Sequence, residues 1–418
     1  MISTLRGPIL GSWALMLALS PLHGMAQQAN HEALETSSTL RFSDIYNSAL
    51  QNAPETLERD VRVRQAESYE AIASNWISNR PSIQLGYYND QLLDDIGMRE
   101  FEYAVQLELK RPSERNTGRL LSQAYQNQVD AWEQSLHHYI AGRVRSALSA
   151  IAEAEANLRL ETHATANAEE LFSVTSSLVN AGELARLDLM QAENLLLTQR
   201  RTELEAEAML VDAERAYEVL TDLHVRPDYV YTETLTEREE IDESHPRLQY
   251  LQTEITLADA NIAQRQADAR GSPTISLGSR RTRSDSFQPY SDSIALSLSI
   301  PFGAKNIVES RTSLARRDKV NVEVLYQNTL RTLNQSLHEV EHELFLTNEA
   351  IGLSSQQLEL SEQRWQMAQT AFSQGEISLT QVIQALQETQ SARKQSELLG
   401  LQRERLIIEF NQTIGVMP

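Results

Sequence analysis

Two segments of this chain share one pattern: AGELARLDLMQA at 181–192 and QGEISLTQVIQA at 374–385. In each, a glycine near the start separates two long stretches rich in helix-forming residues, which is where a helix commonly ends in the left-handed conformation. We therefore predict two tight turns between long helices. The turns explain the glycines but not the matching side chains that follow, whose partner is either the neighbouring hairpin or another protein at an exposed tip: Leu184 and Ile377, Leu189 and Val382, Gln191 and Gln384.

The similarity between the two halves extends along the chain. PSIQLG at 81–86 corresponds to PTISLG at 273–278, and VQLELKRP at 105–112 corresponds to IALSLSIP at 294–301. The period of about 190 residues is far longer than a solenoid unit. The sequence therefore predicts a duplicated domain, in which each copy runs helix, strand, loop, strand, very long helix, tight turn and second helix. We place the boundaries at 27–42 for an N-terminal segment, 43–226 for the first repeat, 227–243 for a linker and 244–418 for the second repeat.

Long helices are predicted because residues that break them are scarce. The 418 residues include only 15 Gly and 11 Pro, and no Pro lies between Pro112 and Pro227 or between Pro301 and Pro418. This excludes Rossmann, sandwich and TIM-type folds, which need a turn roughly every ten to fifteen residues. A helix over 113–179 would be roughly 100 Å long. Leucines in heptad spacing, such as Leu189 and Leu196, predict coiled-coil packing, so the fold class is mainly α with a small β part.

The β part is predicted from segments in which apolar and polar residues alternate. They lie at 83–89, 103–110, 274–280 and 293–300. This period of two fits a soluble sheet and a membrane barrel equally well. Four strands cannot close a barrel alone, since the smallest bacterial barrels use about eight.

The N-terminus predicts export. Arg6, an apolar stretch at 9–20 and the small residues Gly24 and Ala26 are typical of a signal peptide at 1–26. No later segment is long and apolar enough for a membrane-spanning helix, so we expect the strands to meet a membrane in a barrel shared between subunits. The formal charge of −21 disfavours nucleic acid as a partner. The absence of cysteine excludes disulfides, thiolate metal sites and cysteine nucleophiles.

The most prominent enzyme-like motif is HEVEH at 338–342, which has the HExxH form of zinc peptidases. We interpret it as a pair of histidines on a helix surface, because both lie away from the apolar line that includes Val340 and no third ligand motif follows. An incidental or transport-related metal contact is the alternative. No phosphate-binding glycine loop or GxSxG motif is present, so we predict no catalytic, cofactor or resident metal site. The charged pairs 94–95 and 280–281 are expected in or beside loops, either solvated or at a pore mouth.

Together, the tip motifs, the PSIQLG strand, the proline after the second strand and the duplication resemble the TolC-like outer-membrane efflux family, also called outer-membrane factors. The resemblance covers about residues 40 to 415. It implies a homotrimer in which a twelve-stranded barrel in the bacterial outer membrane continues as an α-helical coiled-coil barrel across the periplasm. It implies a passive exit duct for small molecules or metal cations in a tripartite efflux or type I secretion system. An inner-membrane pump would drive transport through a periplasmic adaptor.

The resemblance also implies roles for individual residues. The adaptor would dock on the tips, at Gly182, Leu184, Gly375 and Ile377. The periplasmic gate would lie at Asp188, Gln381 and Gln384, although some members have two carboxylates where this chain has the two glutamines. The HPRL segment at 245–248 is most similar to the cation-efflux relatives. The alternatives are an exported coiled-coil adaptor or scaffold without a pore, and a zinc peptidase.

Overall fold

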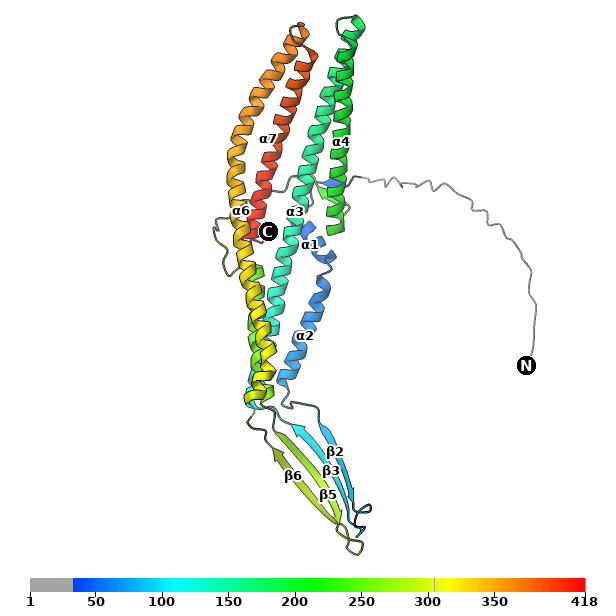
Figure 1. Cartoon of the computed structure of the whole chain (residues 1–418), viewed down its shortest axis with the longest axis vertical. Coiled ribbons are helices and arrows are strands. Elements are labelled where there is room, and N and C mark those ends of the chain that lie inside the picture. The colour runs from blue at the N-terminus through cyan, green and yellow to red at the C-terminus, as the bar shows by residue number, and fades with distance from the viewer. Residues whose placement is uncertain (1–32, 304, 418) are drawn as a thin grey trace, which may run out of the picture. The chain divides into compact units, whose positions relative to one another are not determined.

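The structure is a computed structural model that describes residues 33–303 and 305–417, so the predicted signal peptide lies outside the described residues. Figure 1 shows the helices and strands in these ranges. The helices are α1 (Phe42–Asn52), α2 (Thr56–Ser74), α3 (Pro112–Ala181), α4 (Arg186–Thr221), α5 (Pro246–Ala269), α6 (Lys305–Ser373) and α7 (Leu379–Thr413). The strands are β1 (Glu35–Ser37), β2 (Ser82–Asn89), β3 (Arg99–Glu108), β4 (Val225–Pro227), β5 (Thr274–Arg283) and β6 (Ser291–Ser299).

The two longest helices confirm the prediction from the proline-free stretches. Helix α3 has 70 residues and α6 has 69. Helix α3 begins with Pro112, whose missing N–H costs nothing in the first turn, and the Glu114 carboxylate accepts from the backbone N–H of Arg111 at 3.0 Å. None of the helices in the described part of the chain combines the length and the hydropathy that crossing a bilayer would need.

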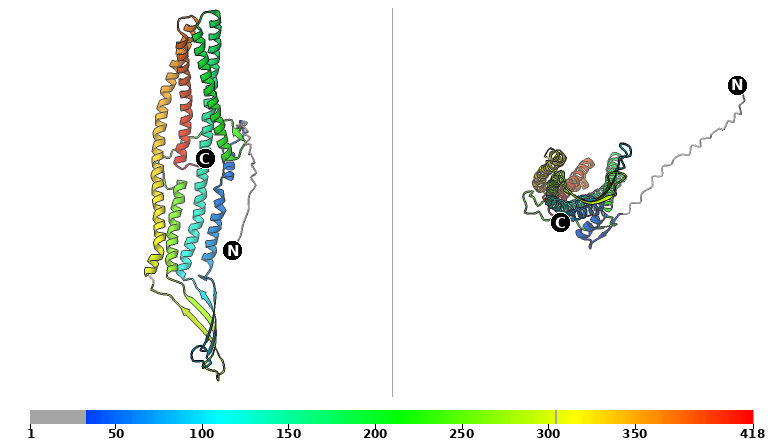
Figure 2. Two further views of the ribbon diagram at one scale, coloured as in Figure 1. Left: turned by 45° about the vertical axis from the view of Figure 1, so that its right-hand side comes forward. Right: turned by 90° about the horizontal axis from the view of Figure 1, so that it is seen from below.

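The helices form two hairpins that lie side by side (Figure 2). Helix α3 packs against α4 toward the tips and against α2 and α5 in its other half, and α6 packs against α7 and α5. Since α3 and α7 also pack against each other, α4 and α6 lie at opposite edges of the chain.

The sheet has the strand order β2-β3-β5-β6, and each strand is antiparallel to the strands beside it. The central pair, β3 with β5, joins the two repeats. All four predicted strands are present, but β5 extends through Arg283. The expectation that Arg280 and Arg281 lie in or beside a loop is therefore wrong, because the hydrogen-bonded register with β3 continues past both of them. Asp94 and Asp95 do lie in the loop between β2 and β3.

The linker between the repeats is anchored near the middle of α3 by a buried ion pair. Arg145 Nε and Nη2 donate to the Glu233 carboxylate at 2.7 and 3.1 Å, and Nη1 donates to Oε1 of Gln412 at 2.6 Å. Burial alone would raise the pKa of Glu233, but hydrogen bonds from Arg145, Tyr231 and Asn411 outweigh it and leave this pKa lowered. The network connects the linker, α3 and the end of α7. Such a pair resists disruption because either charge alone would be left buried.

Candidate functional site

One face of the sheet is apolar and exposed. The register places Ile83, Val105, Leu277 and Leu296 in one row across all four strands. Adjacent rows contain Leu107, Ile275 and Leu298 on the helix side and Leu85, Tyr103 and Ile294 on the loop side. Ile83 and Leu296 are each 74% exposed. We call these residues the apolar sheet face. Contiguous apolar patches of this kind mark surfaces that contact another protein or a membrane.

Aromatic residues flank the apolar sheet face at both ends. On the loop side, Tyr87 and Phe101 pack with ring centroids 4.8 Å apart. On the helix side, Trp76 and Phe302 are exposed. Rows of aliphatic residues between two aromatic girdles are typical of the outer surface of an outer-membrane barrel.

The opposite face of the sheet is polar and carries small side chains. Gln106 donates to Gln84 at 2.6 Å, and Arg280 Nε lies 3.0 Å from Glu100 Oε1 and also pairs with Glu102. A Cβ at Gly278 would lie only 2.6 Å from the backbone oxygen of Tyr103, so no larger residue fits this central position. Such a face is suited to line a water-filled space.

The two helical tips have the same turn. Gly182 and Gly375 adopt φ values of +81° and +73°. In each turn, the glycine N–H and the next N–H donate to carbonyls of the preceding helix, to Val179 and Leu178 in the first turn and to Phe372 and Ala371 in the second. This is the Schellman motif, which requires a left-handed residue. The predicted turns are confirmed.

The predicted gate residues lie just after these turns and form hydrogen bonds within their own helices. Asp188 accepts from the N–H of Ala185 at 3.1 Å, and Gln381 accepts from the N–H of Ser378 at 3.0 Å. Both side chains therefore cap a helix N-terminus. Gln384 donates to Glu388 at 2.9 Å.

A bond between the two hairpins at the tips was not foreseen from the sequence. The Thr380 hydroxyl of α7 donates to Oε1 of Gln191 of α4 at 3.2 Å. The sequence marked Gln191 only by its match to Gln384 in the repeated tip pattern. That match does not identify Thr380 as the residue that Gln191 binds.

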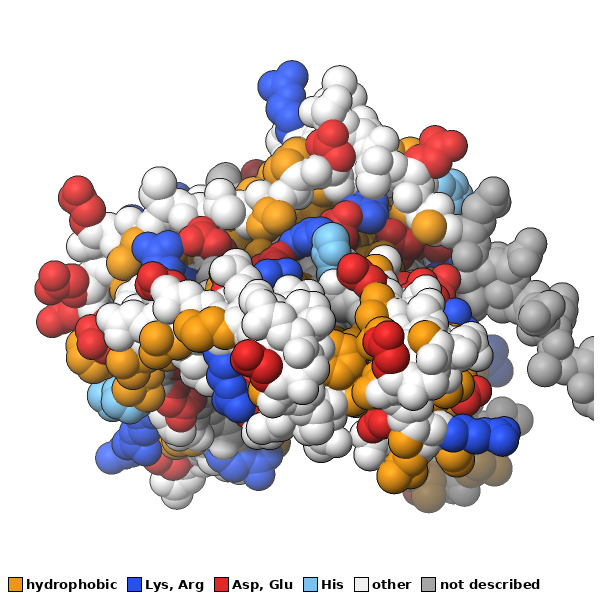
Figure 3. Space-filling model, turned by 90° about the horizontal axis from the view of Figure 1, so that it is seen from above, with side chains coloured by type: hydrophobic (Ala, Val, Ile, Leu, Met, Phe, Trp, Pro, Cys, Tyr) orange, Lys and Arg blue, Asp and Glu red, His pale blue; other side chains and the backbone are white. Residues whose placement is uncertain are grey.

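The apolar docking residues do not share one environment. Ile377 is half-buried against a cluster that includes Leu379, Val382 and Leu386. Of the two partners considered for Ile377, the neighbouring hairpin therefore contributes, because the two hairpins enclose a core almost to their ends. Leu184 is half-buried and lines a cavity of about 530 Å³ between the hairpins, together with Trp365 and Phe372. Figure 3 shows apolar side chains in the gap between the hairpin ends.

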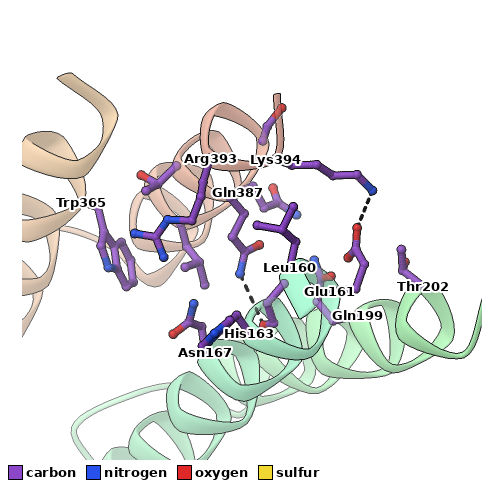
Figure 4. A pocket seen from close by; sticks show the side chains of 15 residues that line it. Leu160, Glu161, His163, Asn167, Gln199, Thr202, Trp365, Gln387, Arg393 and Lys394 are labelled. Carbon is purple, nitrogen blue, oxygen red and sulfur yellow. Dashed lines mark hydrogen bonds and ion pairs between the residues drawn. The ribbon is translucent and has the colours of Figure 1, made fainter. Parts of the chain in front are cut away.

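Farther from the tips, the space between the hairpins is polar. A cavity of about 580 Å³ is lined by His163, Trp365 and Arg393, among others. Figure 4 shows Lys394 of α7 pointing toward Glu161 of α3, with Nζ and Oε1 2.6 Å apart. Arg393 pairs with Glu362 at 2.7 Å. Both cations are therefore paired with carboxylates of the same chain. The pair between Lys394 and Glu161 links the two hairpins across this cavity.

The outer helices carry exposed apolar lines that sequence reasoning missed. The α6 seam consists of exposed side chains at seven-residue intervals: Leu346, Leu353, Leu360 and Met367. The α4 seam consists of Met190, Leu197 and Leu204 at the same intervals. Met367 lies eight residues before Gly375, and Met190 lies eight residues after Gly182. The two seams therefore begin at the same number of residues from their tips. Heptad lines of this kind form coiled-coil contacts, but these have no partner within the described chain.

The HExxH histidines, His338 and His342, lie on the exposed side of α6. Leu337 and Val340 of the same helix are buried against Leu406 of α7. The interpretation of the motif as a surface pair agrees with this placement. His138 of α3 is different, since it is buried beside His245 with ring centroids 5.1 Å apart.

The fold has counterparts among solved structures. No protein-family model and no curated protein sequence matches the chain. The crystal structure of CusC has a TM-score of 0.70 at 15% identity, covering 94% of this chain and 96% of CusC. The outer-membrane protein VceC of Vibrio cholerae has a TM-score of 0.71 at 13% identity, covering 90% and 96%. The outer-membrane channel CmeC of Campylobacter jejuni has a TM-score of 0.69 at 14% identity, covering 99% and 94%.

These likenesses extend over nearly the whole length of both chains in each comparison. At 90% or more of this chain in each case, they span both of its repeats. The chain therefore has the fold of the TolC-like outer-membrane channels.

Proposed function

We propose that this protein is the outer-membrane exit duct of a tripartite efflux or secretion system and conducts small molecules or metal cations passively. The observation that carries the proposal is the apolar sheet face, whose rows are exposed across all four strands while the opposite face is polar. A lipid-facing wall needs the first face and an aqueous lumen needs the second. A scaffold without a pore would need neither an exposed apolar face nor a polar face opposite it. The proposed role does not involve catalysis.

The duct is a homotrimer in this proposal. Three sheets supply the twelve strands that one barrel needs, since four cannot close. The helices support the same arrangement, because the α6 seam lies at one edge of the chain and the α4 seam at the other. Each subunit can then place its α6 seam on the α4 seam of the next. Such a head-to-tail contact closes into a ring of three when successive subunits are related by a rotation of about 120°.

In this arrangement, the barrel lies in the outer membrane and the helices extend into the periplasm, with the tips farthest from the barrel. The periplasmic adaptor docks on the tips and couples the duct to an inner-membrane pump. The cavity at Leu184 offers an apolar recess for an adaptor side chain, and Leu187 in the first turn of α4 is exposed. Gly182 and Gly375 set the shape of the docking surface and Ile377 supports it from the tip core. Asp188, Gln381 and Gln384 line the gate.

Ion conductance in a planar bilayer tests the proposal. The wild-type protein should migrate as a heat-sensitive, detergent-resistant trimer and form channels. Leu296→Arg should abolish channel insertion, because a charge on the lipid face costs about 2–4 kcal/mol at the membrane midplane and occurs three times per trimer. Ser297→Arg, the next residue on the polar face, is the matched control and should insert normally. A wild-type protein that gives no conductance would contradict the duct.

A further inference from the structure

One histidine pair on α6 has no part in the proposed duct. The rings of His338 and His342 have centroids 6.4 Å apart and planes only 15° apart, and both are exposed. Two imidazoles one turn apart on a helix face can chelate one divalent transition-metal ion, such as Zn²⁺.

One chain supplies only part of such a site. Protein sites for zinc use at least three side-chain ligands. Among residues 33–303 and 305–417, no group of three or more His, Asp or Glu side chains is arranged to hold a metal ion. A complete site at this pair therefore needs a side chain from another copy of the chain.

The position of the pair along α6 indicates where that side chain lies. His342 is four residues before Leu346, so it lies on the same side of α6 as the end of the α6 seam that is farther from the tip. The seams are antiparallel and equally spaced from their turn glycines, so Leu346 would face Val211 of the partner subunit. The histidine pair would then face the C-terminal end of α4. That end carries Glu218, and His224 follows it.

His224 already has the arrangement of a metal ligand. Its Nδ1 lies 2.7 Å from Oε1 of Glu218, so the ring donates this proton to the carboxylate and leaves Nε2 free. Arg215 pairs with the other oxygen of the same carboxylate. The His224 side chain is 79% exposed. A carboxylate that accepts from one ring nitrogen commonly orients a histidine that binds metal through the other.

We propose that His338 and His342 of one subunit, together with His224 of the partner subunit, bind a divalent transition-metal ion at each interface of the trimer. Glu218 acts as the positioning residue for His224. The site rests on the trimer of the proposed function and is incomplete without the partner copy. The ion connects two helices near the ends of their seams, so its binding stabilises the assembled ring.

Zinc titration of the full-length trimer tests this site. The protein is purified in detergent, stripped of metal and titrated with Zn²⁺ in a calorimeter, and we expect one ion per subunit. His338→Ala with His342→Ala should remove this binding. His224→Ala and Glu218→Gln should each weaken it roughly tenfold or more. The control is His163→Ala, which replaces an exposed histidine of α3 outside the proposed site. This variant should bind zinc like the wild type. Zinc should also raise the temperature at which the wild-type trimer dissociates.

The outcomes separate this site from the duct itself. Trimers that conduct ions but bind no zinc would overturn the metal site alone. Zinc binding that is unchanged in His224→Ala would overturn the shared site, because the ligand from the partner would then be dispensable. A protein that neither trimerises nor conducts would overturn both proposals.

Discussion

Helices α3 and α6 occupy equivalent places in the two repeats and have nearly the same length, yet their surroundings differ. Buried residues follow α3 from Glu114 to Thr175, whereas α6 buries only a few, among them Leu337 and Val340. One matched pair shows the contrast directly. Leu160 and Leu353 stand equally far from their turn glycines, but Leu160 is 9% exposed and Leu353 is 70% exposed.

The difference follows from position. Helix α3 is central and packs against α2, α4, α5 and α7, whereas α6 is at an edge and packs against α5 and α7. A duplicated sequence keeps its apolar heptads in both copies, but one chain can cover only the central helix. The exposed line on α6 is therefore what a neighbouring subunit would cover, and each of the following predictions tests this contrast.

The largest effect is expected from the α6 seam. Leu353→Asp with Leu360→Asp should abolish the trimer, because six carboxylates per ring would lie in apolar contacts where burying an unpaired charge is prohibitive. The helical content by circular dichroism should remain, since both side chains are exposed in the single chain. Cross-linking and light scattering measure the oligomer. Gln366→Asp, at an exposed position on another face of the same helix, is the control and should still form trimers. Normal trimers from the double variant would contradict the seam.

The matched leucines should separate folding from assembly. Leu160→Ala should lower the free energy of unfolding of the chain by about 2–5 kcal/mol, because it removes buried methyl groups and leaves a cavity. Leu353→Ala should leave the unfolding of the monomer nearly unchanged and lower the dissociation temperature of the trimer. Urea unfolding in a monomeric background that keeps both leucines, Leu346→Asp with Leu360→Asp, compares Leu160→Ala with Leu353→Ala. Equal losses of monomer stability from the two leucines would contradict the contrast.

The buried histidine of α3 should make the stability of the chain depend on pH. Burial, followed by the nearby His245, lowers the pKa of His138 on α3 from 6.5 to about 4. The neutral ring is therefore favoured in the folded state. Its stabilisation is complete above about pH 6.5 and is lost as the pH falls toward 4, with a loss of about 2 kcal/mol between pH 7 and pH 5.

Chemical unfolding at several pH values measures this loss. His138→Gln should flatten the dependence in this range, leaving the part that belongs to His245, whose pKa burial also lowers. A wild-type stability that does not change between pH 7 and pH 5 would count against a neutral, buried His138.

The smallest effect is expected at the tips. Gln384→Ala should raise basal conductance without changing trimer yield, since the side chain lies at the proposed gate and its bond to Glu388 is local. Gln363→Ala removes a similar local contact, to Glu359 on α6, and should conduct like the wild type. Single-channel recordings compare the two variants. Equal basal conductance in both would place the gate elsewhere.

Much of the architecture could be predicted from local patterns. The gaps between prolines predicted the long helices, the alternation at 103–110 predicted a strand, and the glycines at 182 and 375 predicted the turns. These features depend on the backbone preferences and the periodicity of neighbouring residues, which any segment carries with it. The same reasoning predicted that His338 and His342 lie off the buried line of α6.

Contacts between distant segments required the tertiary structure. No local pattern indicates that β3 pairs with β5, that Arg145 meets Glu233, or that Ile377 enters a core. Periodicity tells which residues share a face but not which element covers that face. Leu160 and Leu353 have the same residue type at equivalent positions of a repeated pattern, and only the packing of the whole chain leaves the second one exposed, because a central helix has neighbours on every side and an edge helix does not.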